Sequence, residues 1–225
     1  MSLDAVVFDF DGLIIDTEWV IYDTARAAFA CHGHELPEAA WATIVGLADD
    51  DGAAWTALLE AAGVEGFALT DYTAAYESQD RSNRDTLPAL PGVEALIDAL
   101  TASGVPIGVA SSSDRAWLDR HLGRLGLAEH FGAIVGADAV GGIGKPAPDV
   151  YLRACADLGA DPGRSVALED SAHGINAAKA AGMAAVAVPS RITHFNDFAA
   201  ADLVVSSLED VSLGRLRQVV ATLLR

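Results

Sequence analysis

Two aspartates follow an apolar run near the start of the chain, in the stretch AVVFDFDG at residues 5–12. Residues i and i+2 of an extended strand lie on the same side, so Asp9 and Asp11 would present two carboxylates to one place. Like charges repel each other, and burial removes the water that stabilises them. We therefore expect a cation or a chemical task to accompany this pair.

Polar residues end three further apolar runs. The run VPIGVA leads to Ser111 and Ser112, the run AIVGA leads through a glycine-rich loop to Lys145, and SVAL leads to Glu169 and Asp170. Turn and capping residues commonly follow strands, so each position alone has an ordinary structural explanation. Their combination at the ends of four apolar runs predicts a chemical site.

The residue types at these ends suit phosphoryl transfer. Oxygen ligands favour a hard ion such as Mg²⁺, and the carboxylates available for it are those of Asp9, Asp11, Glu169 and Asp170. Lys145 and Ser111 could hold a phosphoryl group, one by charge and one by a hydrogen bond. An aspartate can act as the nucleophile, and a second carboxyl nearby can transfer protons.

The elements that must position these residues follow from the pattern of apolar runs. From Pro88 onwards, short apolar runs alternate with segments of helical periodicity. This alternation predicts an α/β fold, with a parallel sheet covered by helices on both faces. Such sheets place their active groups at the carboxyl ends of the strands, and the polar residues above fall there.

Residues 17–85 show helical periodicity only, in WVIYDTARAAFACHG, DDDGAAWTALLEAAG and TDYTAAYESQDRSNR. We therefore expect a Rossmann-like core formed by residues 1–15 and 87–225, with an all-helical cap inserted at residues 16–86. Two hinge segments, 13–17 and 83–91, would join them. Asp16 in the first hinge is expected to cap a helix or to make a hinge hydrogen bond. A cap of this kind would close over a substrate and exclude water.

The composition excludes several classes of partner. The 225 residues carry a net charge of −18, and the 14 Lys and Arg residues form no basic stripe, so nucleic acid and anionic membranes are not expected partners. No apolar run approaches the ~20 residues of a membrane span, and the start lacks a signal-peptide pattern. Cys31 and Cys155 lie far apart, and we expect both to be buried and reduced in a cytoplasmic protein. The sequence does not indicate an oligomeric state.

Four motifs occur in order along the chain: DFDGLIIDTE, VASSS, GKPAPDVY and LEDSAHGINAAKAAG. Together they resemble the haloacid dehalogenase-like hydrolase superfamily, in particular the branch of β-phosphoglucomutase-like proteins and small sugar-phosphate phosphatases. The helical block after the first motif is similar to the cap of that branch. The resemblance implies a Mg²⁺-dependent phosphatase that acts on a small phosphorylated metabolite, with a sugar phosphate as the expected substrate.

The resemblance also implies roles for individual residues. Asp9 would be the nucleophile that forms an aspartyl phosphate, and Asp11 would be the general acid and base, with its backbone carbonyl on Mg²⁺. Ser111 would bind the phosphoryl group, and Lys145 would neutralise it. Gly12 would let backbone N–H groups approach the phosphate.

Three further residues complete the predicted site. By the same resemblance, Asp170 would bind Mg²⁺ directly and Glu169 would hold a metal-bound water. Ser112 and Ser113 are expected to cap the following helix, whose N-terminus would favour the phosphate. Ser112 is therefore counted among the phosphate-binding residues.

Departures from the family pattern separate three activities. Halide-cleaving members lack the second aspartate, so Asp11 argues against a dehalogenase. The mutase resemblance requires a histidine where Ile21 stands and a cationic cap, whereas the cap loop carries Asp49, Asp50 and Asp51. Carboxylates there would repel the second phosphate of a bisphosphate intermediate. Hydrolysis is preferred, and a mutase stays open because Arg81 and Arg84 could supply a cationic contact.

Two other classes of protein use or keep a similar set of residues. Phospho-receiver signalling domains combine an aspartate cluster, Mg²⁺, a hydroxyl and a lysine, but they lack a helical block after the first strand. A binding protein that had lost catalysis would be expected to lack Asp9 or Lys145, and both are present. The sequence therefore favours an enzyme, while the identity of its phosphate ester stays open.

Overall fold

A parallel β-sheet forms the centre of the protein. The computed structural model describes residues 3–47, 53–64 and 85–223, together with positions 70, 74, 75 and 77. Within these residues the strands are β1 (Ala5–Phe8), β2 (Ile107–Ala110), β3 (Ala133–Val135), β4 (Ser165–Glu169), β5 (Ala184–Ala187) and β6 (Leu203–Val204). They pair in parallel in the order β3-β2-β1-β4-β5-β6, which places β1 and β4 at the centre. Each strand coincides with an apolar run of the sequence.

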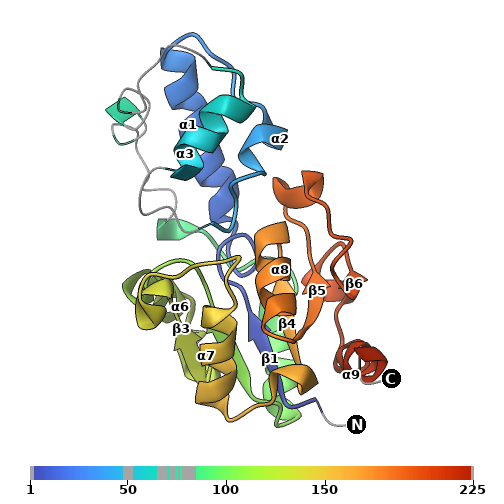
Figure 1. The fold of residues 1–225 in the computed structure, drawn as a ribbon. Helices are drawn as coiled ribbons and strands as arrows, with labels where there is room; N and C mark the ends of the chain where they lie inside the picture. Colours follow the sequence, from blue (N-terminus) through green and yellow to red (C-terminus); the bar gives the residue numbers. More distant parts are fainter. Residues whose placement is uncertain are drawn as a thin grey trace.

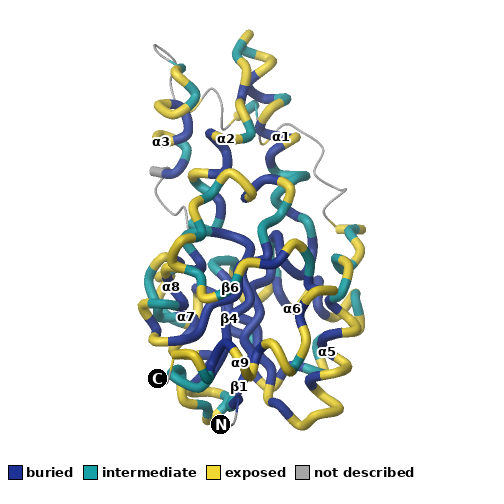
Figure 2. Tube along the Cα trace, turned by 90° about the vertical axis from the view of Figure 1, so that its right-hand side faces the viewer, coloured by how far each residue is buried: buried dark blue, intermediate teal, exposed yellow. Residues whose placement is uncertain are grey.

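Helices cover both faces of this sheet. On one face lie α5 (Val93–Ala102), α6 (Arg115–Leu125) and α9 (Leu213–Leu223); on the other lie α7 (Asp149–Leu158) and α8 (Ala172–Ala180). Alternate residues of β1 enter the two cores, because Phe8 packs with the first group of helices and Val7 with the second. Figure 2 shows the central strands as buried and the helices with exposed residues on their outer sides, and β1, β2, β4 and β5 are buried along their whole length. The prediction of an α/β fold is confirmed.

A separate helical lobe lies beyond the carboxyl ends of the strands, at the top of Figure 1. It contains α1 (Thr17–Cys31), α2 (Glu38–Trp41) and α3 (Ala53–Ala61). Its core includes Tyr22, Phe29, Trp41 and Leu58, all buried. The lobe is the helical cap that the sequence predicts, inserted after β1. The short helix α2 was not predicted, since four residues are too few for a helical period to be recognised.

Parts of the predicted cap lie outside the described residues. These are most of the third predicted helix at residues 70–84, the acidic loop residues Asp49, Asp50 and Asp51, and both Arg81 and Arg84. The domain boundaries at residues 15 and 86 stay predictions.

The two linkers between the sheet and the cap lie side by side. The backbone N–H of Leu90 donates to the carbonyl of Ile14 at 2.8 Å, and Ile15 forms a bridge with Ala89. Asp16 caps α1 by accepting a hydrogen bond of 3.3 Å from the N–H of Trp19, as the sequence predicts. Paired linkers fix the position from which the cap reaches the sheet edge.

Two expectations from the sequence concern the burial of the cysteines and the length of the apolar helices. Cys155 is buried, but Cys31 is exposed at the end of α1, so the expectation that both cysteines are buried was wrong for Cys31. Cys31 is the last residue of α1, and Ala30 before it is exposed as well. Among the described residues, no helix is both long enough and apolar enough to cross a membrane.

Candidate active site

Asp9 and Lys145 meet at the carboxyl edge of the sheet. Asp9 directly follows β1, and its backbone N–H donates to the carbonyl of Leu168 at 2.9 Å. The ammonium group of Lys145 donates to Asp9 Oδ1 and, at 2.5 Å, to Glu169 Oε1. Asp9 is 5% exposed and Lys145 is 3% exposed. The structure thus places an almost water-free ion pair where the sequence predicts a nucleophile and a charge-neutralising lysine.

Glu169, the last residue of β4, is fully occupied by hydrogen bonds. Besides Lys145, the hydroxyl of Tyr151 donates to its Oε1 at 2.6 Å, and the N–H and hydroxyl of Ser171 each donate to its Oε2 at 3.2 Å. The helix α8 approaches this carboxylate closely, because a Cβ on Gly174 would lie 1.9 Å from Glu169 Oε1. Glu169 therefore positions Lys145. The sequence-based expectation was that Glu169 holds a metal-bound water, and it did not include this contact.

Asp170 lies beside Asp9 and Glu169. Carboxylate oxygens of the three residues lie within 4.8 Å of one another, and all three side chains are buried. The Thr193 hydroxyl is 3.4 Å from Asp170 Oδ2. Gly12 packs against this group with a φ of +89°, and a Cβ there would lie 2.3 Å from Asp170 Oδ2. Only a glycine lets the loop after Asp11 pass this close to the Asp170 carboxylate.

The carboxylates of Asp9, Glu169 and Asp170 carry more negative charge than Lys145 can neutralise. Burial, followed by the charge of Glu169, raises the pKa of Asp9 from 3.8 to about 8, although Lys145 lowers it. Burial and the charge of Asp9 also raise the pKa of Asp170 well above its usual value. Burial alone would lower the pKa of Lys145, but Asp9 and Glu169 raise it above its usual value. One ammonium for three buried carboxylates leaves a net negative site.

This donor set fits a hard divalent cation. Such ions prefer carboxylate oxygens, and their charge would offset the repulsion that raises these pKa values. Asp9 and Asp170 offer the carboxylate oxygens, since those of Glu169 already accept four hydrogen bonds.

Asp11 is held by three donors. Its Oδ1 accepts from the Thr17 hydroxyl at 2.8 Å and from Trp117 Nε1 at 3.1 Å, and its Oδ2 accepts from the Ser113 hydroxyl at 2.7 Å. The donors come from the start of α1, from α6 and from the loop after β2. The expectation that Ser113 caps α6 was wrong, because Asp114 is the cap and accepts from Trp117 N at 2.7 Å.

The two remaining predicted residues lie in the loop after β2. Ser111 is 2% exposed, and its hydroxyl accepts from the N–H of Ser113 at 3.0 Å. The Ser112 hydroxyl donates to the carbonyl of Gly46 in the cap at 2.9 Å and accepts from the N–H of Lys145 at 3.1 Å. Ser112 therefore joins the cap to the lysine loop, and the expectation that it caps α6 was wrong for the same reason as for Ser113.

The cap loop at residues 42–47 lies on the carboxyl edge of the core. Asn196 Nδ2 donates to the carbonyl of Ala42 at 2.9 Å, and His173 Nε2 lies 3.0 Å from the carbonyl of Thr43. A Cβ on Gly46 would approach the Ser171 hydroxyl to 2.6 Å. The cap thus covers the acidic cluster and separates it from bulk water.

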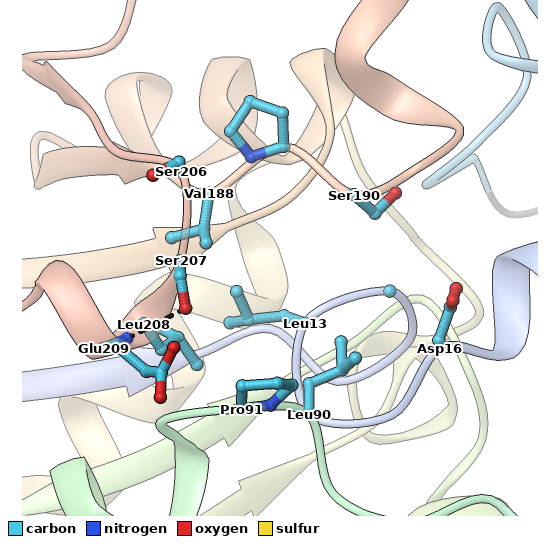
Figure 3. A pocket seen from close by; sticks show the side chains of 12 residues that line it. Leu13, Asp16, Leu90, Pro91, Val188, Ser190, Ser206, Ser207, Leu208 and Glu209 are labelled. Carbon is cyan, nitrogen blue, oxygen red and sulfur yellow. Dashed lines mark hydrogen bonds between the residues drawn. The ribbon is translucent and has the colours of Figure 1, made fainter.

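A cavity of about 280 Å³ lies behind the linkers (Figure 3). Leu13 and Asp16 come from the first linker and Leu90 and Pro91 from the second, and Glu209 lines the cavity beside Pro91. None of Asp9, Lys145 or Asp170 lines it. We therefore place the chemistry at the acidic cluster and not in this cavity.

Sequence reasoning assigned no role to Tyr151, Ser171, Gly174 or Trp117. Tyr151 and Ser171 contact Glu169, Gly174 makes room for it, and Trp117 contacts Asp11. A weak signal existed for Tyr151, because it is the last residue of the motif GKPAPDVY. The other contacts depend on how α6 and α8 pack, which residue types alone do not specify.

The fold and the site place a lysine and three buried carboxylates together at the carboxyl edge of a Rossmann-like sheet. The sequence profile described as haloacid dehalogenase-like hydrolase matches residues 6–188. The chain therefore belongs to the haloacid dehalogenase-like hydrolase family, and the resemblance seen in the sequence is confirmed. Phosphatases of this family generally use a divalent metal, with which the buried acidic cluster agrees.

Curated relatives match almost the whole chain. YhcW of Bacillus subtilis is 36% identical over 214 residues, which cover 95% of this chain and 96% of YhcW. Hexitol phosphatase B of Escherichia coli K12 is 33% identical over 217 residues (92% and 94%). The β-phosphoglucomutase of Bacillus subtilis is also 33% identical, over 234 residues (96% and 95%). Overall identity therefore does not separate a phosphatase from a mutase.

A solved structure shares the whole architecture. A family hydrolase from Deinococcus radiodurans with bound phosphate and sodium superposes with a TM-score of 0.74 at 30% identity, covering 98% of this chain and 96% of that one. Phosphate and a cation are thus both present in a protein of the same fold.

Proposed function

We propose that the protein is a Mg²⁺-dependent phosphatase that hydrolyses small phosphate monoesters, sugar phosphates foremost, with Asp9 as the nucleophile. The observation that carries this proposal is the buried contact between Asp9 and Lys145 beside the carboxylates of Glu169 and Asp170. Family membership and the phosphatases among the relatives confirm the sequence prediction of a hydrolase acting on phosphate monoesters. A cytoplasmic location stays a prediction.

Asp9 has the position that a nucleophile requires. Its carboxylate lies at the end of a rigid central strand, and Lys145 holds one of its oxygens in place. The attack of Asp9 on phosphorus forms an aspartyl phosphate and releases the alcohol. Lys145 and Ser111 neutralise and bind the phosphoryl oxygens, and the cap contacts exclude competing water.

Asp11 is the residue proposed to move protons. It would protonate the leaving oxygen in the first step and take a proton from the attacking water in the second. Thr17, Ser113 and Trp117 fix its carboxylate by hydrogen bonds. Since Thr17 is the first residue of α1, the position of this acid depends on the position of the cap.

Mg²⁺ would be held by Asp9 and Asp170, with the backbone carbonyl of Asp11 as a further ligand by the family resemblance. When bound, the ion supplies positive charge next to the phosphoryl oxygens and allows the buried carboxylates to ionise at neutral pH. Gly12 supports this arrangement by permitting the close approach of its loop to Asp170.

Hydrolysis is preferred to a mutase reaction. A mutase must bind a second phosphate, and anion binding in a covered site needs a cation. In residues 16–47 and 53–64 the one Lys or Arg side chain is Arg26, which is exposed and paired with Asp23 at 2.6 Å. At the position where the mutase resemblance requires a histidine, the chain has Ile21, which lines a cavity in the cap beside Trp41.

The test measures phosphate release from a panel of phosphate monoesters in Mg²⁺, with isomerisation of β-glucose 1-phosphate in the presence of the 1,6-bisphosphate measured beside it. The proposal predicts phosphate release that is lost in Asp9→Asn and faster than isomerisation. Isomerisation that outpaces hydrolysis would establish the mutase. Equal phosphate release by the parent and Asp9→Asn would remove Asp9 from the mechanism.

A further inference from the structure

The loop after β5 lies between the cap and the acidic cluster. This β5 loop, residues 188–196, rises from the sheet toward α2 in Figure 1. At its start, the N–H of Val188 donates to the carbonyl of Glu169 at 2.7 Å. At its end, Asn196 Oδ1 accepts from the N–H of Ala172 at 3.0 Å. The loop is therefore hydrogen-bonded to the end of β4 and to the start of α8.

Three side chains of the β5 loop contact the cap. Ile192 is fully buried and belongs to the apolar cluster of the cap. The guanidinium group of Arg191 lies over the ring of Trp19, 3.2 Å from the ring centroid. Asn196 Nδ2 donates to the carbonyl of Ala42 at 2.9 Å. The cap thus holds the loop by apolar burial, by a cation–π contact and by a hydrogen bond.

Two hydroxyl side chains of the same loop contact Asp170. The buried Thr193 hydroxyl donates to Asp170 Oδ2 at 3.4 Å, and Ser190 is a second hydrogen-bond partner of this carboxylate. The backbone N–H groups of Ser190 and Thr193 each donate to the hydroxyl of the other, at 2.8 Å and 3.3 Å. These reciprocal bonds close the turn that contains Arg191 and Ile192. A shift of the two cap-facing residues would therefore move both hydroxyls.

The orientation of Asp170 affects how well the site can hold Mg²⁺. This ion demands near-ideal octahedral geometry, and hydrogen bonds to a ligating carboxylate fix the direction in which its oxygens point. Asp170 is 1% exposed, so its orientation depends on the protein groups around it and not on bulk water. The β5 loop supplies two of these groups and is itself held by the cap.

We infer that Thr193 is a positioning residue for the Mg²⁺ ligand Asp170, and that the β5 loop makes Mg²⁺ affinity depend on the docking of the cap. The inference rests on the proposed function through the assignment of Asp170 as a ligand. Binding linkage is reciprocal, so a docked cap favours Mg²⁺ binding and bound Mg²⁺ favours the docked cap to the same degree. The ion is then held most tightly when the cap covers the site.

Thr193→Val tests the contact with Asp170, because it removes the hydroxyl and keeps the branched shape. In titration calorimetry with Mg²⁺ alone, we expect the Kd to rise about three- to tenfold. Thr193→Ser keeps the hydroxyl and should restore the parent Kd to within about twofold. Thr24→Val is the matched control, since Thr24 is a buried threonine of α1 whose hydroxyl donates to the carbonyl of Val20. An unchanged Kd in Thr193→Val, or an equal rise in Thr24→Val, would overturn the inference.

Arg191→Met tests the dependence on the cap, and the sign of its effect is diagnostic. Loss of a positive charge alone would tighten the binding of a cation. Loss of the contact with Trp19 weakens cap docking instead, so we expect the Kd for Mg²⁺ to rise about two- to fivefold. Arg153→Met is the control, because Arg153 is an exposed residue of α7 paired with Asp157, and it should leave the Kd unchanged. A Kd for Arg191→Met at or below the parent value would rule out coupling to the cap.

A double variant tests whether the effect passes through the Thr193 hydroxyl. Residues that act through a shared partner give non-additive effects. Arg191→Met combined with Thr193→Val should therefore raise the Kd for Mg²⁺ by less than the product of the two single rises. A combined rise equal to that product would mean that the two residues act independently, and it would contradict the inference.

Calorimetry without a substrate separates this inference from the proposed function. The expected Kd shifts without phosphate release from any monoester would support the inference and overturn the phosphatase. Phosphate release with the parent Kd in both single variants would do the reverse, and no Mg²⁺ binding by the parent would overturn both. Circular dichroism melting in EDTA establishes that each variant is folded. Because Arg191 is exposed, Arg191→Met provides the answer if Thr193→Val does not fold.

Discussion

The hydroxyl of Ser112 in the core donates a hydrogen bond of 2.9 Å to the carbonyl of Gly46 in the cap. The two residues are 66 positions apart in the sequence. The same hydroxyl accepts from the backbone N–H of Lys145 at 3.1 Å, so one side chain links the cap loop to the lysine that contacts the nucleophile. Cap position and active-site geometry are therefore coupled through Ser112.

The first prediction concerns this link. Ser112→Ala removes the donor to Gly46 and the acceptor for the Lys145 N–H, and we expect kcat/KM to fall about three- to thirtyfold. Ser103→Ala is the control, since among the described residues its hydroxyl bonds to Leu100 O alone, at the end of α5. Steady-state kinetics with one phosphate ester compares the two. An effect of the same size in both variants would contradict a specific role for Ser112.

The second prediction concerns the space that Gly12 provides. Gly12→Ala places a methyl group 2.3 Å from Asp170 Oδ2 and also forces an alanine into a φ of +89°. Gly104→Ala shares a positive φ of +70° but meets no atom within 4 Å, so it isolates the backbone cost of about 1 kcal/mol. We expect Gly12→Ala alone to weaken Mg²⁺ binding at least about tenfold in titration calorimetry. Equal Mg²⁺ affinity in both variants would show that the contact is unimportant.

The third prediction concerns pH and Glu18. Burial, and then the charge of Asp11, raises the pKa of Glu18 from 4.5 to about 8 in the folded protein. Between these values the unfolded chain gives up the proton while the folded protein keeps it, so folding becomes less favourable as pH rises. Glu18→Gln removes this effect. As the pH rises from 5 to 8.5, its free energy of unfolding should increase by about 1–2 kcal/mol relative to that of the parent, a figure that allows for the partial exposure of Glu18.

Thermal melting at several pH values measures this difference. A gain of about 1–2 kcal/mol corresponds to roughly 2–8 °C in a chain of this size. A melting temperature that changes in parallel for the parent and for Glu18→Gln would show that Glu18 does not retain its proton in the folded protein.

The fourth prediction concerns the metal. Mg²⁺ at a hundred times its Kd should stabilise the folded protein by about 2.7 kcal/mol, or roughly 5–10 °C in melting temperature. EDTA should abolish both this increment and phosphate release. Asp170→Asn should remove the increment, whereas Asp202→Asn, which breaks the ion pair with Lys179 on α8, should retain it. An unchanged increment in Asp170→Asn would place the ion elsewhere.

The sequence predicted most of the fold and the residues of the site because both follow one rule. The carboxyl ends of adjacent parallel strands meet at one edge, so Asp9 after β1 and Asp170 after β4 lie close together. Contacts that depend on helix packing could not be predicted in this way. Tyr151 on α7 reaches Glu169 only because α7 lies against β1 and β2, and Gly174 matters only because α8 approaches Glu169.

Other expectations failed for local reasons. Asp114 outcompetes the preceding serines as the cap of α6, because an aspartate at this position accepts directly from the N–H of Trp117. Ser113 is thereby free to contact Asp11, a partner 102 positions away. A single sequence contains no signal for such a long-range contact. It does show that Ser112, Ser113 and Asp114 are all residue types that can cap a helix.

The most direct test of the account traps phosphate on Asp9. The parent and Asp9→Asn are each mixed in Mg²⁺ with a phosphate ester that the parent hydrolyses, and the reaction is quenched in acid. Borohydride is then added, because it reduces an acyl phosphate to an alcohol. Peptide mass spectrometry then locates the reduced residue. The account predicts reduction at Asp9 in the parent and none in Asp9→Asn, which should also lose phosphate release. Reduction at another carboxylate, or full turnover by Asp9→Asn, would contradict it.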